Sequence, residues 1–171
     1  MIYYFAYGSN LHPLRLKERV PAAHLVGVTE LSKHRLAFHK QSGDGSAKCN
    51  MHQTGSGTDS VLGAIYKFPR EHKDILDRFE GNGSGYIDEH VLLGHQGREH
   101  ACYTYYAQDS HIVDHLRPYH WYKKLVVLGA KYLKFPDSYI SAIEAVESVE
   151  DQQLQRRQEM GILIDKIRDY S

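Results

Sequence analysis

The pattern of apolar and polar residues divides the chain into a strand-rich first part and a helical last third. Apolar, β-branched and aromatic runs between turn residues predict strands at 2–6, 25–31, 34–39, 61–68, 86–93 and 99–107. Apolar residues spaced three or four apart predict helices at 70–80, 120–132, 138–147 and 150–168. Strands that precede helices, rather than alternating with them, indicate an α+β fold with a mostly antiparallel or mixed, curved sheet.

Turn and loop signals refine this division. Gly8 ends the first strand, and Ser9 and Asn10 offer N-cap side chains for a helical segment that ends near Pro21. The stretch 41–60, rich in Gly, Ser and Thr, predicts a long loop or irregular hairpin near a functional site.

The last predicted helix, 150–168, carries its apolar residues on one stripe, which either caps the core or meets a partner subunit. We expect a single domain over 1–171, with 150–171 as a C-terminal helical extension.

Composition and charge narrow the function classes. The 171 residues include 21 Lys and Arg and 21 Asp and Glu, so the formal net charge is zero. Without a basic run, we expect no nucleic-acid partner and no anionic-membrane partner. The N-terminus lacks signal-peptide features and no apolar stretch is long enough to cross a bilayer, so we expect a cytoplasmic protein. Cys49 and Cys102 form no C-x-x-C pattern and are interpreted as reduced structural thiols.

The first candidate for chemistry is the segment Tyr7–Asn10 between the first strand and the first predicted helix. Its glycine would let the backbone approach a ligand closely, and free N–H groups there could bind a carboxylate or an oxyanion. The alternative is an ordinary strand-to-helix turn with a Ser or Asn cap. Ser9 as a nucleophile would need a general base that the sequence does not identify.

The second candidate is Glu80, at the C-terminal end of the predicted helix 70–80. A carboxylate there opposes the helix dipole, so a role other than helix stability is indicated. In a desolvated pocket it could act as a general base. The alternative is a solvated surface glutamate.

A third candidate, the histidines His111, His115 and His120, could be drawn as a metal site. However, no H-E-x-x-H frame is present, and Pro118 interrupts any single helix that would join the three. Nucleotide-binding glycine motifs and the G-x-S-x-G elbow do not occur. The sequence thus favours neither metal nor nucleotide chemistry.

Three blocks in a fixed order resemble the γ-glutamylcyclotransferase family. They are Tyr4–Leu11 (YFAYGSNL), Leu76–Gly81 (LDRFEG) and Tyr122–Ala130 (YKKLVVLGA), and the resemblance extends over residues 2 to about 147. It implies an α+β fold built round a small mixed barrel, and a lyase or acyltransferase type of enzyme that converts γ-glutamyl amino acids to 5-oxoproline and a free amine. It also implies chemistry without a cofactor or metal.

By matching motif positions, the resemblance implies that Glu80 is the general acid/base. It also implies that Tyr7, Gly8, Ser9 and Asn10 hold the γ-glutamyl group, largely through backbone N–H groups, and that Tyr122 contacts the substrate, with core packing as its alternative. Tyr86 is a further candidate, but other members place one residue between the glycine and the tyrosine, whereas Gly85 and Tyr86 are adjacent here. A one-residue shift turns a strand side chain to the opposite face, which argues against Tyr86 as a pocket residue.

Alternative functions stay open at this point. Relatives of this fold cleave γ-glutamyl groups from larger acyl carriers, amines or antibiotic precursors, and a non-catalytic protein could have kept the pocket as a γ-glutamyl-ligand binding site. Asn10-Leu11, where glutathione-specific relatives differ, argues against glutathione as substrate. A homodimer is a further expectation.

Overall fold

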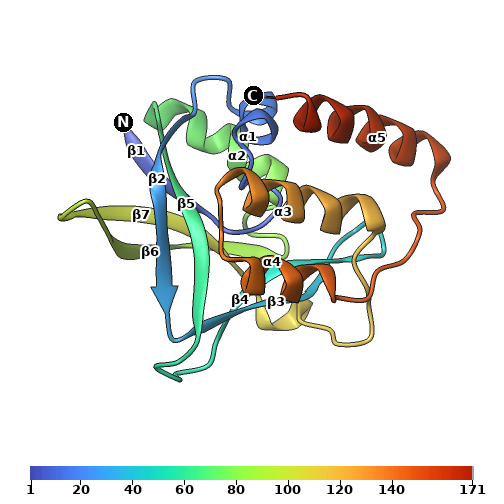
Figure 1. Ribbon diagram of the computed structural model, residues 1–171, viewed down its shortest axis with the longest axis horizontal. Helices are drawn as coiled ribbons and strands as arrows, with labels where there is room; N and C mark the ends of the chain where they lie inside the picture. Colours follow the sequence, from blue (N-terminus) through green and yellow to red (C-terminus); the bar gives the residue numbers. More distant parts are fainter. Residues whose placement is uncertain (171) are drawn as a thin grey trace.

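The protein is described by a computed structural model that covers residues 1–170. The predicted α+β class is confirmed, with the strands in the first two thirds of the chain and most of the helical residues in the last third (Figure 1). The strands are β1 (Ile2–Ala6), β2 (His24–Ser32), β3 (His34–Gln41), β4 (Ala47–Gln53), β5 (Ser60–Phe68), β6 (Tyr86–His95) and β7 (Arg98–Ala107). The helices are α1 (Pro13–Arg19), α2 (Lys73–Glu80), α3 (His120–Tyr132), α4 (Asp137–Glu144) and α5 (Leu154–Arg168), with short 3₁₀ turns at Arg70–His72 and Asp109–His111.

The main sheet has five strands in the order β2-β5-β1-β7-β6, and β3 and β4 form a separate two-stranded ribbon. β1 lies at the centre, antiparallel to β5 and parallel to β7, which explains why its residues Tyr4, Phe5 and Ala6 are buried. A strand with neighbours on both sides and cover on both faces favours such a continuous apolar run.

The sheet curves until its two edge strands approach each other, but it does not close. The hydroxyl of Thr29 on β2 donates to the carbonyl of Gly94 on β6 at 2.7 Å, and no strand pairing joins β2 to β6 among residues 1–170. The small barrel implied by the resemblance is therefore an open, barrel-like sheet. The right-handed twist of strands accounts for this curvature.

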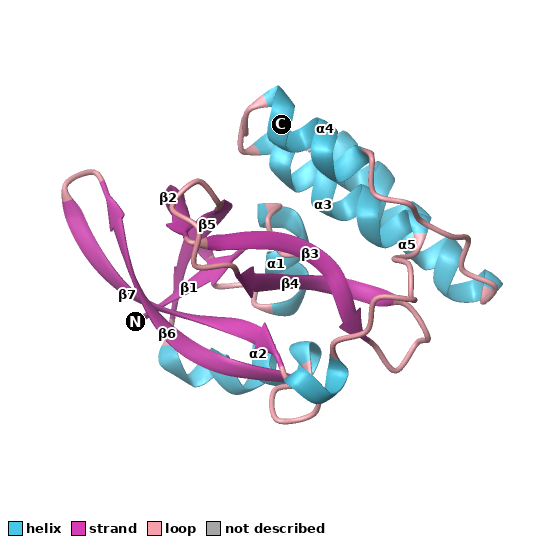
Figure 2. Cartoon of the chain, turned by 90° about the horizontal axis from the view of Figure 1, so that it is seen from below, coloured by secondary structure: helices cyan, strands magenta, loops and turns pink. Residues whose placement is uncertain are grey.

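The helices α3, α4 and α5 lie side by side at one side of the strands (Figure 2). The stripe of α5 packs on α3 in a cluster formed by Leu125, Leu163, Ile164 and Ile167. Of the two uses expected for 150–168, this packing favours the core, although the helix itself begins only at Leu154. No helix within residues 1–170 is long and apolar enough to cross a membrane.

Two local predictions need correction. Of the long loop or irregular hairpin expected for 41–60, the hairpin is confirmed and the long loop is wrong, because the stretch contains β4, which pairs antiparallel with β3 across a register shift and buries Cys49 and Met51. Its sequence lacks β-branched residues, so pairing and burial, rather than propensity, make it a strand.

The second error concerns the start of α1. Ser9 and Asn10 lie in the loop before the helix, and the N-cap is His12, whose Nδ1 accepts a hydrogen bond from the N–H of Leu14 at 3.2 Å. Pro13 follows at the first helical position, where its missing N–H costs no helix bond.

Candidate active site

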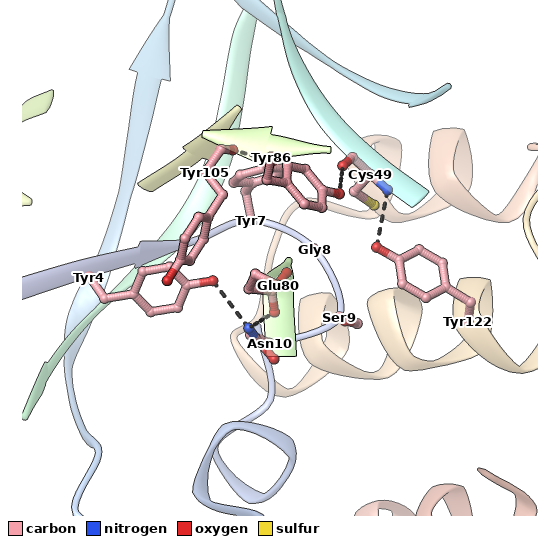
Figure 3. Close-up of a pocket in the computed structure, with 10 residues that line it drawn as sticks. All are labelled: Tyr4, Tyr7, Gly8, Ser9, Asn10, Cys49, Glu80, Tyr86, Tyr105 and Tyr122. Atoms are coloured by element: carbon pink, nitrogen blue, oxygen red, sulfur yellow. Dashed lines mark hydrogen bonds between the residues drawn. The ribbon is translucent and has the colours of Figure 1, made fainter. Parts of the chain in front are cut away.

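A single pocket brings together all the residues that the sequence marks as catalytic or substrate-binding (Figure 3). Its walls come from β1 and the loop after it, from β4, from the end of α2, from the facing ends of β6 and β7, and from α3. The lining residues are Tyr4, Tyr7, Gly8, Ser9, Asn10, Cys49, Glu80, Tyr86, Tyr105 and Tyr122.

The loop after β1 lines this pocket with residues whose backbone N–H groups have no acceptor within residues 1–170. Among residues 1–170, no acceptor takes a hydrogen bond from the N–H of Gly8, Ser9 or Asn10, whereas the carbonyl of Gly8 accepts one from Leu11 at 3.1 Å. A Cβ on Gly8 would lie only 3.1 Å from the Cβ of Cys49, so glycine allows the loop to lie against β4. The segment thus has the free N–H groups that could bind a carboxylate or an oxyanion.

Glu80 is the last residue of α2, and Gly81 ends that helix with φ of 67°. The Oε1 atom of Glu80 accepts hydrogen bonds from Arg19 at 2.5 Å and from the amide of Asn10 at 2.9 Å. Its side chain is 17 % exposed, which excludes a solvated surface glutamate. The adjacent guanidinium forms an ion pair with this carboxylate, and Oε2 receives no hydrogen bond from the described residues.

Sequence reasoning missed Arg19. This residue ends α1, and its guanidinium donates to Asn10 Oδ1 at 3.0 Å as well as to Glu80, while it lies 5.3 Å from the centre of the Phe79 ring. A basic residue in the last turn of a helix looks like an ordinary complement to the helix dipole. Only the packing of α1 beside α2 reveals its contact with Glu80.

The opposite wall is fixed to the backbone of one residue of β4. The N–H of Cys49 donates to the hydroxyl of Tyr122 at 3.0 Å, and its carbonyl accepts from the hydroxyl of Tyr86 at 2.5 Å. Burial raises the pKa of both tyrosines well above its ordinary value, so both hydroxyls stay protonated and neutral. Tyr122 therefore lines the pocket and packs in the core at the same time.

The expectation against Tyr86 as a pocket residue is wrong, because the backbone of the glycine-rich link before β6 sets the direction in which the chain enters that strand. Gly83 and Gly85 have φ of 80° and 122°, which side chains rarely permit, and the N–H of Gly85 donates to Gln108 Oε1 at 2.9 Å. The chain thereby enters β6 with Tyr86 facing inward, 5 % exposed.

Three tyrosines from β1, its loop and β7 complete the pocket. The hydroxyl of Tyr7 donates to the carbonyl of Tyr105 at 2.6 Å, and that of Tyr105 donates to Asp77 at 2.5 Å. Tyr4 accepts from the amide of Asn10 at 3.2 Å. Tyr4, Tyr105 and Cys49 were missed, because their sequence surroundings are those of ordinary buried strand residues.

The histidines considered as metal ligands lie apart from this pocket. His111 Nδ1 lies 3.0 Å from Ser110 Oγ, and His120 Nδ1 lies 2.8 Å from Ser148 Oγ. Within residues 1–170, no three His, Cys, Asp or Glu side chains gather in a way that could hold a metal ion.

Comparison with known proteins finds one family and several relatives. A family model described as the AIG2-like family matches residues 60–143. Gamma-glutamylcyclotransferases from Bos taurus and Homo sapiens are each 32 % identical to this chain, over 84 % of it and 78 % of the relative. A solved structure named gamma-glutamyl cyclotransferase superposes with a TM-score of 0.82 at 30 % identity, covering 96 % of this chain and 98 % of the other.

Proposed function

The chain belongs to the γ-glutamylcyclotransferase family, and from this premise we propose how its pocket releases 5-oxoproline from γ-glutamyl amino acids or amines. The proposed reaction is an intramolecular aminolysis with Glu80 as general acid and base. The main support for this proposal is the different bonding of the two carboxylate oxygens of Glu80. Oε1 is held by Arg19 and Asn10, and Oε2 is free of protein partners among the described residues.

The substrate supplies its own nucleophile. Its α-amine loses a proton to Glu80 and attacks the γ-carbonyl carbon, which forms the ring C–N bond. The amide C–N bond then breaks, and Glu80 returns the proton to the departing amine, so that no other reactant is consumed. A closed pocket favours the folded conformer that this five-membered ring closure needs. Proton transfer by one positioned carboxylate fits both steps.

The loop residues Gly8, Ser9 and Asn10 are proposed to stabilise the charge on the substrate side. Their N–H groups are available for the γ-glutamyl carboxylate or for the oxyanion that forms at the γ-carbonyl. Tyr7, Tyr86 and Tyr122 give the pocket its shape, and their hydroxyls are hydrogen-bonded within the protein.

Arg19 and Asn10 are proposed as positioning residues for Glu80. Both act on Oε1, so they fix the rotamer of the carboxylate and point Oε2 toward the substrate amine. The expected cytoplasmic location and homodimer stay predictions.

The proposal is tested by a screen of γ-glutamyl-alanine, γ-glutamyl-lysine and glutathione for release of 5-oxoproline. We expect release from at least one of the first two, and slower release from glutathione. Saturable binding with no product after prolonged incubation would instead favour a binding protein. Turnover confined to larger γ-glutamyl acyl carriers or antibiotic precursors would assign a different substrate class.

A further inference from the structure

Lys40, the penultimate residue of β3, carries an ammonium on a largely buried side chain. It is 6 % exposed, and no hydrogen bond or ion pair to its ammonium occurs within residues 1–170. The ammonium instead lies over the ring of Tyr86, 4.4 Å from the ring centre. An aromatic face is only a partial substitute for an anion, so this ammonium can still take an anionic partner.

The neighbouring lysine of the same ribbon, Lys48, has the hydrogen-bond acceptors that Lys40 lacks among the described residues. Lys48 on β4 donates to Asp44 at 2.7 Å and to Ser46 at 2.9 Å, and it also lies 4.6 Å from the ring centre of Trp121. Both lysines thus contact aromatic rings, but only Lys48 has an acceptor. The lack of one at Lys40 is a local feature, and not a property of the ribbon.

Three local features bring the Lys40 ammonium to this place beside the pocket. The β3–β4 pairing has a bulge between Phe38 and Lys40, and such bulges redirect side chains next to active sites. A Cβ on Gly85 would lie 2.8 Å from the ammonium, so this glycine leaves room for it. The ring beneath it, Tyr86, is itself a pocket wall.

The charge of Glu80 reaches this ammonium. Burial lowers the pKa of Lys40, and the negative charges of Glu80 and Asp44 oppose that decrease. The pocket therefore contains one carboxylate that can exchange a proton with an amine, and one ammonium without an ion pair in residues 1–170 lies against the ring of Tyr86, which is a wall of the same pocket. A γ-glutamyl amino acid has the complementary pair, because a single carbon separates its leaving nitrogen from a carboxylate.

We propose that Lys40 binds the carboxylate of the leaving amino acid and makes the enzyme selective for γ-glutamyl amino acids over γ-glutamyl amines. This rests on the proposed function, in which Glu80 serves the departing nitrogen and the N–H groups of Gly8–Asn10 serve the γ-glutamyl half. A leaving amine without a carboxylate leaves the Lys40 charge unpaired in the complex.

Two substrates that differ only in this carboxylate test the proposal, γ-glutamyl-L-alanine and γ-glutamyl-ethylamide. The Lys40→Gln variant is expected to lower kcat/KM for γ-glutamyl-L-alanine roughly 10- to 100-fold, as for loss of a hydrogen bond to a charged group. For the ethylamide, the change should be less than about 3-fold, because no carboxylate contact is lost. Lys67→Gln, at an exposed lysine of β5, is the matched control and should leave both values unchanged.

An equal loss on both substrates, or no loss on either, would overturn the proposal. If Lys40→Gln fails to fold by circular dichroism, the wild-type enzyme still decides, because it should prefer γ-glutamyl-L-alanine by about 10-fold or more. Equal wild-type turnover of the two substrates would overturn the proposal without touching the proposed function. If the wild type releases 5-oxoproline from neither substrate, nor from any other γ-glutamyl compound in the screen, the proposed function fails first.

Discussion

The two walls of the pocket are built by different chemistry. On one side, the side chains of Asn10, Arg19 and Glu80 form a charged network between α1 and α2. On the other side, Tyr86 and Tyr122 are neutral and bond to the backbone of Cys49. The difference indicates a division of labour, in which the charged wall moves protons and the neutral wall gives the pocket its shape.

Removal of the Glu80 carboxylate tests the role of the charged wall with the largest expected effect. Glu80→Gln keeps the size of the side chain but cannot accept the proton, so we expect kcat to fall by about 100-fold or more. Binding of a γ-glutamyl ligand, measured by calorimetry, should change little. Glu71→Gln, at an exposed glutamate shortly before α2, is the control, and full activity of Glu80→Gln would remove Glu80 as the acid/base.

Loss of the cation on the same wall should have a smaller effect. Arg19→Gln leaves Glu80 in place but removes its strongest hydrogen bond, and we expect kcat to fall roughly 10- to 100-fold with little change in KM. Arg19→Lys should recover part of this activity, because it restores a cation beside the carboxylate.

A rise in KM that matches the fall in kcat, with no rescue by Arg19→Lys, would contradict this positioning role for Arg19. Arg78→Gln, at an exposed arginine of α2, is the matched control and should leave kcat and KM as they are in the wild type.

The helix that carries Arg19 on the charged wall begins at a histidine, and protonation of this histidine at acidic pH should lower the stability of the protein. His12 caps α1, and burial lowers its pKa to about 4. In the unfolded chain the pKa is about 6.5, so the unfolded state binds a proton first as the pH falls. The contribution of neutral His12 to the free energy of unfolding is therefore fully present above a pH of about 6.5, and it falls as the pH decreases toward about 4. Between pH 7 and pH 5, about 2 kcal/mol of it is lost.

Urea unfolding at these two pH values measures that loss. His12→Asn keeps a capping side chain without a group that titrates in this range, and it should show a smaller pH dependence. An equal dependence in the variant would place the acid sensitivity elsewhere.

On the neutral wall, removal of one hydroxyl should affect stability more than chemistry. Tyr122→Phe leaves the buried N–H of Cys49 without its acceptor, which should lower the free energy of unfolding by about 1–2 kcal/mol. The value of kcat should change little, unlike that of Arg19→Gln. The control is Tyr132→Phe, at a tyrosine that is 38 % exposed, and a fall in kcat of Tyr122→Phe as large as that of Arg19→Gln would contradict the division between the two walls.

How far the sequence predicts this site also differs between the walls. Glu80 and the loop Tyr7–Asn10 belong to contiguous motifs, so the sequence identifies them directly. Arg19 and Cys49 act through contacts between elements that are distant in the chain, and their local patterns are those of a helix end and a buried thiol. No property of either residue alone indicates the contact.

The same reasoning explains the structural errors. β4 has no β-branched residue, so its strand character depends on pairing with β3, which propensity does not describe. The orientation of Tyr86 depends on the positive φ angles of Gly83 and Gly85, whereas register alone predicts the opposite face. The regular apolar strands β1 and β5 are predicted to within one residue, because burial and pattern agree there.

The central claim, ring closure by the substrate's own amine, is tested most directly by the products formed in H₂¹⁸O. Wild-type enzyme incubated with γ-glutamyl-L-alanine should yield alanine and 5-oxoproline in equal amounts, and mass spectrometry should find no solvent oxygen in the 5-oxoproline. Release of ¹⁸O-labelled glutamate would show that water is the nucleophile, and this result would contradict the account.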